Sequence, residues 1–97
     1  MKYTIDEIKK ITTPIAKEYD VSRMFLFGSY AKNTADEDSD IDFYIEKGGV
    51  NSLIVYYSFV NQLEKKFDRH VDVVTTEIRD RDFLDAIKKD GILIYEK

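Results

Sequence analysis

Residues 25–42, FLFGSYAKNTADEDSDID, contain two predicted strands and the turn that joins them. Met24–Phe27 is a short apolar run that ends at Gly28, which is typical of a buried strand. Asp40–Glu46 alternates apolar and polar side chains, as a strand with one buried face does. A short helix that begins at Ser29 and an acidic loop lie between them. The stretch therefore predicts a strand–helix–loop–strand unit.

Helices and strands alternate on both sides of this unit. Thr4 and Glu7 form a capping box at the start of an N-terminal helix that runs to about Tyr19, and Pro14 is predicted to kink or restart it. Downstream we expect a helix, a strand, a helix that ends before Gly91, and a short strand. Their predicted ranges are 51–67, 71–75, 79–89 and 92–95. This order predicts an α/β (α+β) fold, a small mixed β-sheet with helices packed on it.

The composition limits the classes of function. A chain of 97 residues suits a single domain, 1–97, with one core. Its formal net charge of −4 disfavours direct nucleic-acid binding, because proteins that hold a phosphate backbone carry a basic patch. There is no cysteine, no apolar signal-peptide core and no apolar run near the roughly 20 residues that span a bilayer. We therefore expect a cytoplasmic protein with no membrane partner.

Three aspartates on two predicted strands are candidate metal ligands. Asp40 and Asp42 alternate with apolar residues, so both should point away from the core, roughly 6.5–7 Å apart along the strand. Asp72 lies between two valines of the next strand and should point the same way. If these strands are neighbours in register, the three carboxylates converge into the oxygen ligand set that Mg²⁺ prefers. Alone, an Asp-x-Asp pair favours a turn and a solvated strand face, because the pattern is common.

The turn after the first strand is a candidate phosphate site. The N-terminus of a helix offers free backbone N–H groups and the positive end of its dipole. Gly28 would let the backbone approach a ligand closely, Ser29 supplies a hydroxyl, and Lys32 supplies a positive charge one turn later. Alone, this Gly-Ser pair is equally compatible with an ordinary helix N-cap.

The two patterns together resemble a known signature. The run Gly28–Asn33, an acidic loop and then Ser39–Asp42 resemble the Gly-Ser and Asp-x-Asp signature of the nucleotidyltransferase superfamily, which has a third carboxylate on a later strand. Within it, the chain is similar to the minimal nucleotidyltransferases (MNT) that act as antitoxins in HEPN–MNT toxin–antitoxin pairs. That family usually has Arg-Gly where this chain has Lys32-Asn33.

The resemblance implies a nucleotidyltransferase-like fold and a Mg²⁺-dependent enzyme. It implies transfer of AMP from ATP to a hydroxyl group of a partner HEPN toxin, that of a tyrosine. It also implies two Mg²⁺ ions as cofactor. It also implies six site residues: catalytic and metal-binding Asp40, Asp42 and Asp72, and nucleotide-binding Gly28, Ser29 and Lys32.

Two other functions stay open at this point. One is a non-catalytic antitoxin that neutralises its partner by contact, and the other is a nucleotidyltransferase that acts on a small molecule. Tyr56, Tyr57 and Phe59 could serve a partner interface, although their helical spacing favours core packing. His70 is the only histidine of the chain, and we expect it at the surface or at a strand edge rather than as a ligand.

Overall fold

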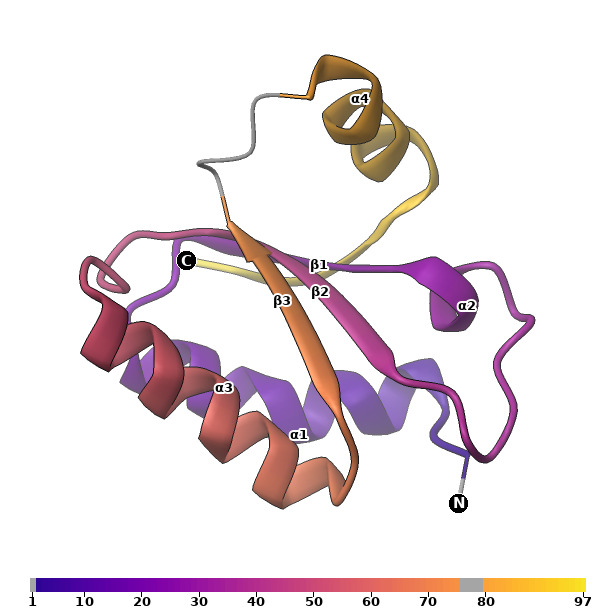
Figure 1. Cartoon of the computed structure of the whole chain (residues 1–97), viewed down its shortest axis with the longest axis horizontal. Coiled ribbons are helices and arrows are strands. Elements are labelled where there is room, and N and C mark those ends of the chain that lie inside the picture. Colours follow the sequence, from indigo (N-terminus) through magenta and orange to yellow (C-terminus); the bar gives the residue numbers. More distant parts are fainter. Residues whose placement is uncertain (1, 76–79) are drawn as a thin grey trace.

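The computed structural model describes residues 2–75 and 80–97, and its helices and strands alternate along the chain as predicted (Figure 1). The elements are α1 (Ile5–Glu18), β1 (Arg23–Phe27), α2 (Gly28–Ala31), β2 (Ile41–Glu46), α3 (Leu53–Phe67), β3 (Val71–Thr75), α4 (Arg81–Asp90) and β4 (Ile92–Glu96). None of the helices in these two ranges is long and apolar enough to cross a bilayer.

Within the described residues, four strands form one mixed sheet in the order β3-β2-β1-β4. β1 is antiparallel to both β2 and β4, whereas β2 and β3 are parallel. The parallel pair is connected through α3, because parallel neighbours need a crossover rather than a tight turn. The mixed sheet predicted from the sequence is confirmed, and its register places Asp42 directly opposite Asp72.

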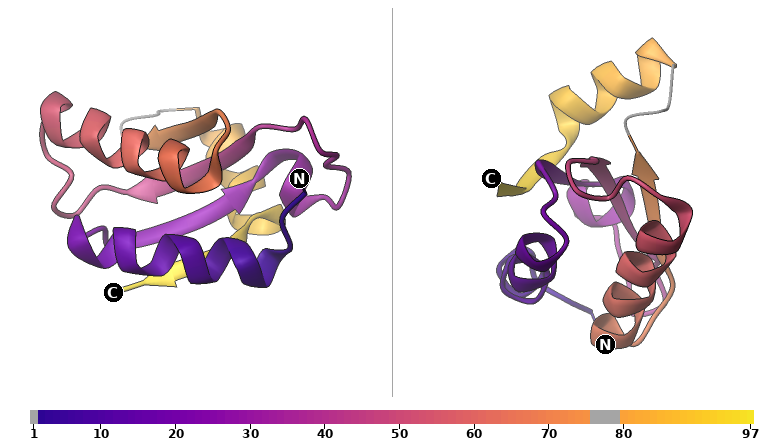
Figure 2. Two further views of the ribbon diagram at one scale, coloured as in Figure 1. Left: turned by 90° about the horizontal axis from the view of Figure 1, so that it is seen from below. Right: turned by 90° about the vertical axis from the view of Figure 1, so that its left-hand side faces the viewer.

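Helices lie on both sides of this sheet. α1 and α3 run side by side across one face, and α4 lies on the other side, against β1 (Figures 1 and 2). The short α2 follows β1 directly at the end of that strand. The candidate site residues on α2, β2 and β3 are therefore held on a sheet that α1 and α3 cover on one face.

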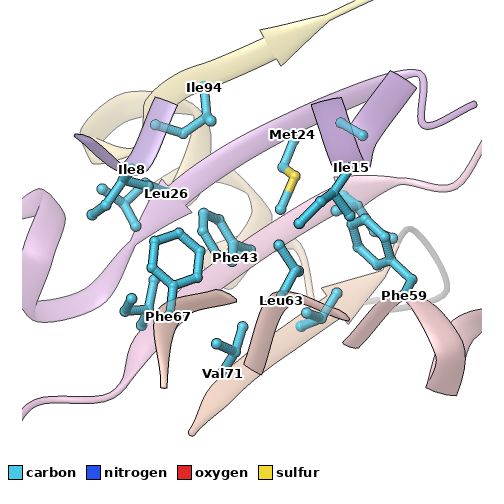
Figure 3. Packing of buried hydrophobic residues seen from close by; sticks show 14 of the residues in the cluster. Ile8, Ile15, Met24, Leu26, Phe43, Phe59, Leu63, Phe67, Val71 and Ile94 are labelled. Carbon is cyan, nitrogen blue, oxygen red and sulfur yellow. The ribbon is translucent and has the colours of Figure 1, made fainter. Parts of the chain in front are cut away.

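The core lies between the sheet and the pair α1 and α3. Ile41, Phe43 and Ile45 of β2 are fully buried there, as their alternation predicts. Side chains from all the strands and from both helices meet around Phe43 (Figure 3). Burial of each large apolar side chain contributes roughly 1.5–3 kcal/mol, so this face fixes the register of β2 and β3. A slip by one residue would exchange the buried isoleucines for aspartates.

Of the kink or restart predicted at Pro14, the restart is wrong. The α-helix α1 continues through Pro14 without restarting, and the hydroxyl of Thr13 donates to the carbonyl of Lys9 at 2.7 Å just before it. Gly91 ends α4 in an extended conformation with φ −72°, not in the left-handed one. A Cβ at this position would overlap the carbonyl oxygen of Ile87, so close approach explains the glycine. The predicted start of this helix, residue 79, lies outside the described residues.

The capping box of α1 is present as predicted. The Glu7 backbone N–H donates to Thr4 Oγ1 at 3.1 Å, and the Thr4 N–H donates to Glu7 Oε1 at 2.8 Å. Both bonds satisfy backbone N–H groups that the first turn of a helix leaves without a partner. They fix where the chain enters the helix that covers the sheet.

We predict that Thr4→Ala lowers the free energy of unfolding by about 1 kcal/mol, because both partners of the box lose their geometry. Urea unfolding followed by circular dichroism would measure this. Thr13→Ala is the matched control in the same helix, and we expect it to stay within about 0.5 kcal/mol of the parent chain because alanine favours helix. Equal effects of both variants would contradict the role of the cap.

Candidate active site

Gly28 at the end of β1 lies against a carboxylate of β2. Its φ is +73°, a left-handed conformation that glycine adopts without strain. A Cβ on Gly28 would overlap Asp42 Oδ2 and lie 3.1 Å from Asp42 Cγ. The glycine of the predicted phosphate turn is therefore in direct contact with the predicted metal ligand. Both the left-handed φ and this contact require glycine here.

The rest of the turn is short. α2 has four residues, and the Ser29 carbonyl accepts a hydrogen bond from the Thr34 backbone N–H at 2.9 Å. Lys32 caps α2 and is exposed; it borders a cavity of about 220 Å³ between α2 and α4. Asn33 has φ +59°, so it adopts the left-handed conformation that the glycine usual at this position favours. The replacement of Arg-Gly by Lys-Asn therefore keeps this backbone conformation.

The loop before β2 is fixed by its own hydrogen bonds. Asp36 Oδ1 accepts from the Asp38 N–H at 2.9 Å, and Ser39 Oγ accepts from the Asp36 N–H, also at 2.9 Å. The bond from the Asp38 N–H and a further one from the Ser39 hydroxyl to Asp36 Oδ1, at 3.2 Å, lower the pKa of Asp36. Arg69 Nη1 donates to the Ser39 carbonyl at 3.2 Å and so ties the loop to the chain before β3. Asp40 follows immediately. It was predicted as the first residue of the strand, but it lies just before β2.

Two of the three predicted carboxylates, Asp40 and Asp72, gather around one point with His70, and Asp42 lies beside Asp72 outside that group of three. Asp42 and Asp72 face each other across the parallel pair of strands, and their carboxyl groups are within hydrogen-bond reach. Asp40, Asp72 and His70 each place one ligand atom within 4.8 Å of the others. The convergence expected from the two strand patterns is thus present. Asp40 contributes to it from the loop end instead of from the strand face.

This arrangement places the negative charges of neighbouring carboxylates close to Asp42. Partial burial, the neighbouring Asp72 and then Asp40 together raise the pKa of Asp42 to about 6. A carboxyl group in such a place is stabilised by a proton or by a cation. Hard oxygen ligands gathered at one point suit a divalent cation, and the donor set of this cluster therefore fits Mg²⁺.

Two further residues belong to this cluster and were not predicted. His70 Nε2 lies 2.8 Å from Asp72 Oδ1, and His70 Nδ1 lies 3.2 Å from Glu64 Oε2 on α3. The bond to Asp72 raises the pKa of His70. His70 is exposed just before β3, as expected, but its ring joins the carboxylates. The two-residue spacing from Asp72, which places both side chains on one face of a strand, is the signal that could have indicated it.

α3 holds the strand that carries Asp72. The Val71 backbone N–H donates to Glu64 Oε2 at 3.1 Å, and the Tyr56 hydroxyl donates to the Val73 carbonyl at 2.7 Å. β3 is an edge strand, and these side chains satisfy backbone groups on its outer side. Asp72 is thereby fixed from both sides, by β2 on one edge and by α3 on the other.

The carboxylates border an open cleft of about 580 Å³. Asp42, Asp72 and His70 form its polar part, and it also has an apolar wall. The wall consists of Phe27, Tyr56, Tyr57, Val60, Val73 and Phe83. This volume is within the range of small-ligand sites, and the mixture of a flat apolar wall and charged groups suits a nucleotide.

Comparison with known proteins agrees with this geometry. Residues 9–97 match the model described as polymerase beta, nucleotidyltransferase. The chain belongs to this nucleotidyltransferase family. It is 41% identical to the Methanocaldococcus jannaschii "Putative protein adenylyltransferase MJ0435" over 73% of this chain and 76% of that protein. It is 33% identical to the protein adenylyltransferase MntA of Thermococcus cleftensis, over 73% of this chain and 76% of the relative.

Two solved structures share the fold. One is a toxin–antitoxin crystal structure with AMP-PNP, which has a TM-score of 0.78 and 19% identity, over 92% of this chain and 73% of that chain. The other is a tri-AMPylated Shewanella oneidensis HEPN toxin in complex with an MNT antitoxin. Its TM-score is 0.73 at 16% identity, over 97% of this chain and 74% of that chain. At these identities the likeness establishes the fold alone.

Proposed function

We propose that this chain is a protein adenylyltransferase that moves AMP from ATP to a tyrosine hydroxyl of a HEPN toxin and thereby acts as its antitoxin. The observation that carries the proposal is the contact between Gly28 and Asp42, with Asp72 opposite Asp42 in register. It joins the turn at the start of α2 to the carboxylates of β2 and β3. Polyphosphate and cation can be held there side by side.

In this mechanism the acceptor oxygen attacks the α-phosphorus of ATP and pyrophosphate leaves. Asp40, Asp42 and Asp72 would hold Mg²⁺, which supplies charge neutralisation at the phosphates. Gly28 and Ser29 direct backbone N–H groups at the terminal phosphates, and Lys32 adds a positive charge nearby. The proton of the acceptor hydroxyl passes to a carboxylate oxygen of Asp72. Positioning and electrostatics account for most of the acceleration.

An exposed apolar surface supports a protein as the acceptor. Leu53 and Ile54 at the start of α3 are 71% and 83% exposed, and Tyr57 on the next turn is 65% exposed. Of the aromatic residues for which the sequence favoured core packing, Phe59 is fully buried but Tyr57 is not. Tyr57 also borders the carboxylate cleft. A partner bound on Leu53, Ile54 and Tyr57 would therefore have its side chains within reach of the cleft.

The experiment that tests the proposal compares two labels. The chain is incubated with a HEPN toxin, MgCl₂ and ATP that carries ³²P at either the α or the γ position. We expect the toxin to gain label from α-labelled ATP alone, and mass spectrometry to place AMP on a tyrosine. Label from neither nucleotide, with Mg²⁺ or Mn²⁺, would refute the enzymatic proposal. An antitoxin that neutralises the toxin by contact without transfer would then be the better account.

We predict that Leu53→Gln/Ile54→Gln weakens binding of the toxin at least about tenfold, since each lost apolar anchor removes about 1 kcal/mol or more. Isothermal titration calorimetry with the toxin would measure it, and ATP binding should be unchanged. Leu93→Gln is the matched control, because Leu93 is also exposed, at 42%, but lies on β4 at the far edge of the sheet from β3. Equal loss in both variants would contradict a binding surface on α3.

A further inference from the structure

We propose that His70 is itself a ligand of the divalent cation, so that the centre is a mixed carboxylate–imidazole site. This inference rests on the function proposed above, because it concerns the cation of the same site. His70 Nε2 is the ligand atom, together with carboxylate oxygens of Asp72 and Asp40. Nothing in the Gly-Ser or Asp-x-Asp pattern indicates an imidazole there.

The distances suit a common ion. His70 Nε2 and Asp72 Oδ1 are 2.8 Å apart, and the ligand atoms of His70, Asp72 and Asp40 all lie within 4.8 Å of one another. Two ligands at right angles around an ion at about 2.1 Å lie about 3.0 Å apart, and two opposite ligands lie about 4.2 Å apart. An ion between His70 and Asp72 therefore requires only a small opening of their present contact. All three side chains are exposed, so a hydrated ion can enter.

Glu64 orients the imidazole for this role. Its Oε2 lies 3.2 Å from His70 Nδ1, and the same oxygen accepts the Val71 N–H at 3.1 Å. The carboxylate is thus fixed by the backbone of β3 and can accept a hydrogen bond from an Nδ1–H, in the tautomer that a bound cation at Nε2 requires. This leaves the lone pair of Nε2 directed at the carboxylates. A metal-binding histidine normally donates its second ring N–H to a carboxylate in this way.

The competing account is an ion pair. A protonated His70 between Asp72 and Glu64 would fill the place of a cation and offer no lone pair to a metal. The two accounts differ in a direct observable, which is whether a bound ion contacts the ring nitrogen. They also differ in metal selection, because an imidazole ligand favours Mn²⁺, Co²⁺ and Zn²⁺ over Mg²⁺ more than carboxylates alone do.

The composition of the chain makes the test sharp. His70 is the only histidine and there is no cysteine, so in a tag-free protein every imidazole signal belongs to His70. The chain without nucleotide is titrated with Mn²⁺, and pulsed electron paramagnetic resonance reads the nitrogen coupling of the bound ion. We expect a coupling of directly bound imidazole. Protein labelled with [¹⁵N]histidine should replace the ¹⁴N coupling by that of ¹⁵N.

Three variants complete the experiment. His70→Asn should lose the coupling and bind Mn²⁺ at least about tenfold more weakly, whereas Glu64→Gln should keep the coupling and bind more weakly by about tenfold. Asp38→Asn, a neighbouring acidic loop residue, should change neither. Mn²⁺ binding that has no nitrogen coupling and is unaffected by His70→Asn would overturn this inference while the transfer assay above still stood. Failure of Mn²⁺ to bind at all would overturn this inference, and the transfer assay above would still decide on the proposed function.

Discussion

Replacing Asp40 and Asp42 together by asparagine is expected to lower AMP transfer to the toxin by at least about 10³-fold. Loss of a single preorganised electrostatic contact costs about 10²–10³-fold in comparable sites, and this variant removes two of the three carboxylates. Asparagine has nearly the same shape, so the packing of β2 should not change. Initial rates of label transfer from α-labelled ATP at saturating Mg²⁺ would measure the loss.

The same variant should be more stable than the parent chain when no metal is present. The pKa of Asp42 is about 6 in the folded chain against about 4 in an unfolded one. The folded state therefore binds the proton more tightly, and stability falls as the pH rises from about 4 to about 6 and stays low above it. Asparagine removes this penalty. Allowing for partial exposure of Asp42, we expect a gain of about 1 kcal/mol at pH 7.5.

The control for both measurements is Asp38→Asn, which removes one negative charge from the loop and none from the cluster. It should transfer AMP at the parental rate and show no comparable gain in urea unfolding at pH 7.5 with EDTA. Transfer by the Asp40/Asp42 variant at more than a tenth of the parental rate would contradict the assigned roles. A gain in stability that persisted at about pH 3 would contradict the electrostatic cause, because Asp42 is then largely protonated in both states.

The elements and faces that hydrophobic patterning governs could be predicted from the sequence. Ile41, Phe43 and Ile45 alternate with polar residues, and burial of large apolar side chains is strong enough to fix which face each residue takes. The sequence also predicted that Asp42 and Asp72 converge if their strands are neighbours in register, and the helix between the two strands suits the crossover that a parallel pair needs. These predictions needed only the period of the pattern and the topology.

The positions of Glu64 and His70 beside the carboxylates could not be predicted in this way. Glu64 lies on α3 and His70 precedes β3, and the turn between them passes through Asp68 in the left-handed conformation, with φ +53°. A non-glycine residue in this conformation leaves little signal in the sequence. The turn is what brings the carboxylate of Glu64 beside the imidazole. Contacts that depend on one unusual backbone angle become visible only in three dimensions.

Gly28→Ala is expected to lower AMP transfer by roughly 100-fold with only a modest loss of stability. The new Cβ would overlap Asp42 Oδ2, which is the end of a side chain and can rotate away. The fold then survives, but the carboxylate leaves its place opposite Asp72. A displacement of about 1 Å at a reacting centre can cost about 10²-fold in rate, and the left-handed φ of +73° adds about 1–2 kcal/mol of strain.

Gly48→Ala separates strain from misplacement. Gly48 also has a positive φ, +51°, and a Cβ there would overlap the backbone carbonyl oxygen of Asp20, which cannot rotate away as a side chain can. We therefore expect Gly48→Ala to lose more stability than Gly28→Ala and yet to transfer AMP at nearly the parental rate at a temperature where both variants are folded. Mn²⁺ affinity should fall in Gly28→Ala only.

Opposite orders of the two variants in stability and in AMP transfer would distinguish a site residue from a structural glycine. If both variants lost activity in proportion to stability, the contact between Gly28 and Asp42 would be a packing feature alone. If Gly28→Ala kept its activity, the turn would tolerate a Cβ because Asp42 is not needed where the structure places it. In either case the contact between the turn and the carboxylates would have no role in AMP transfer, since Gly28 is the residue where the two halves of the candidate site touch.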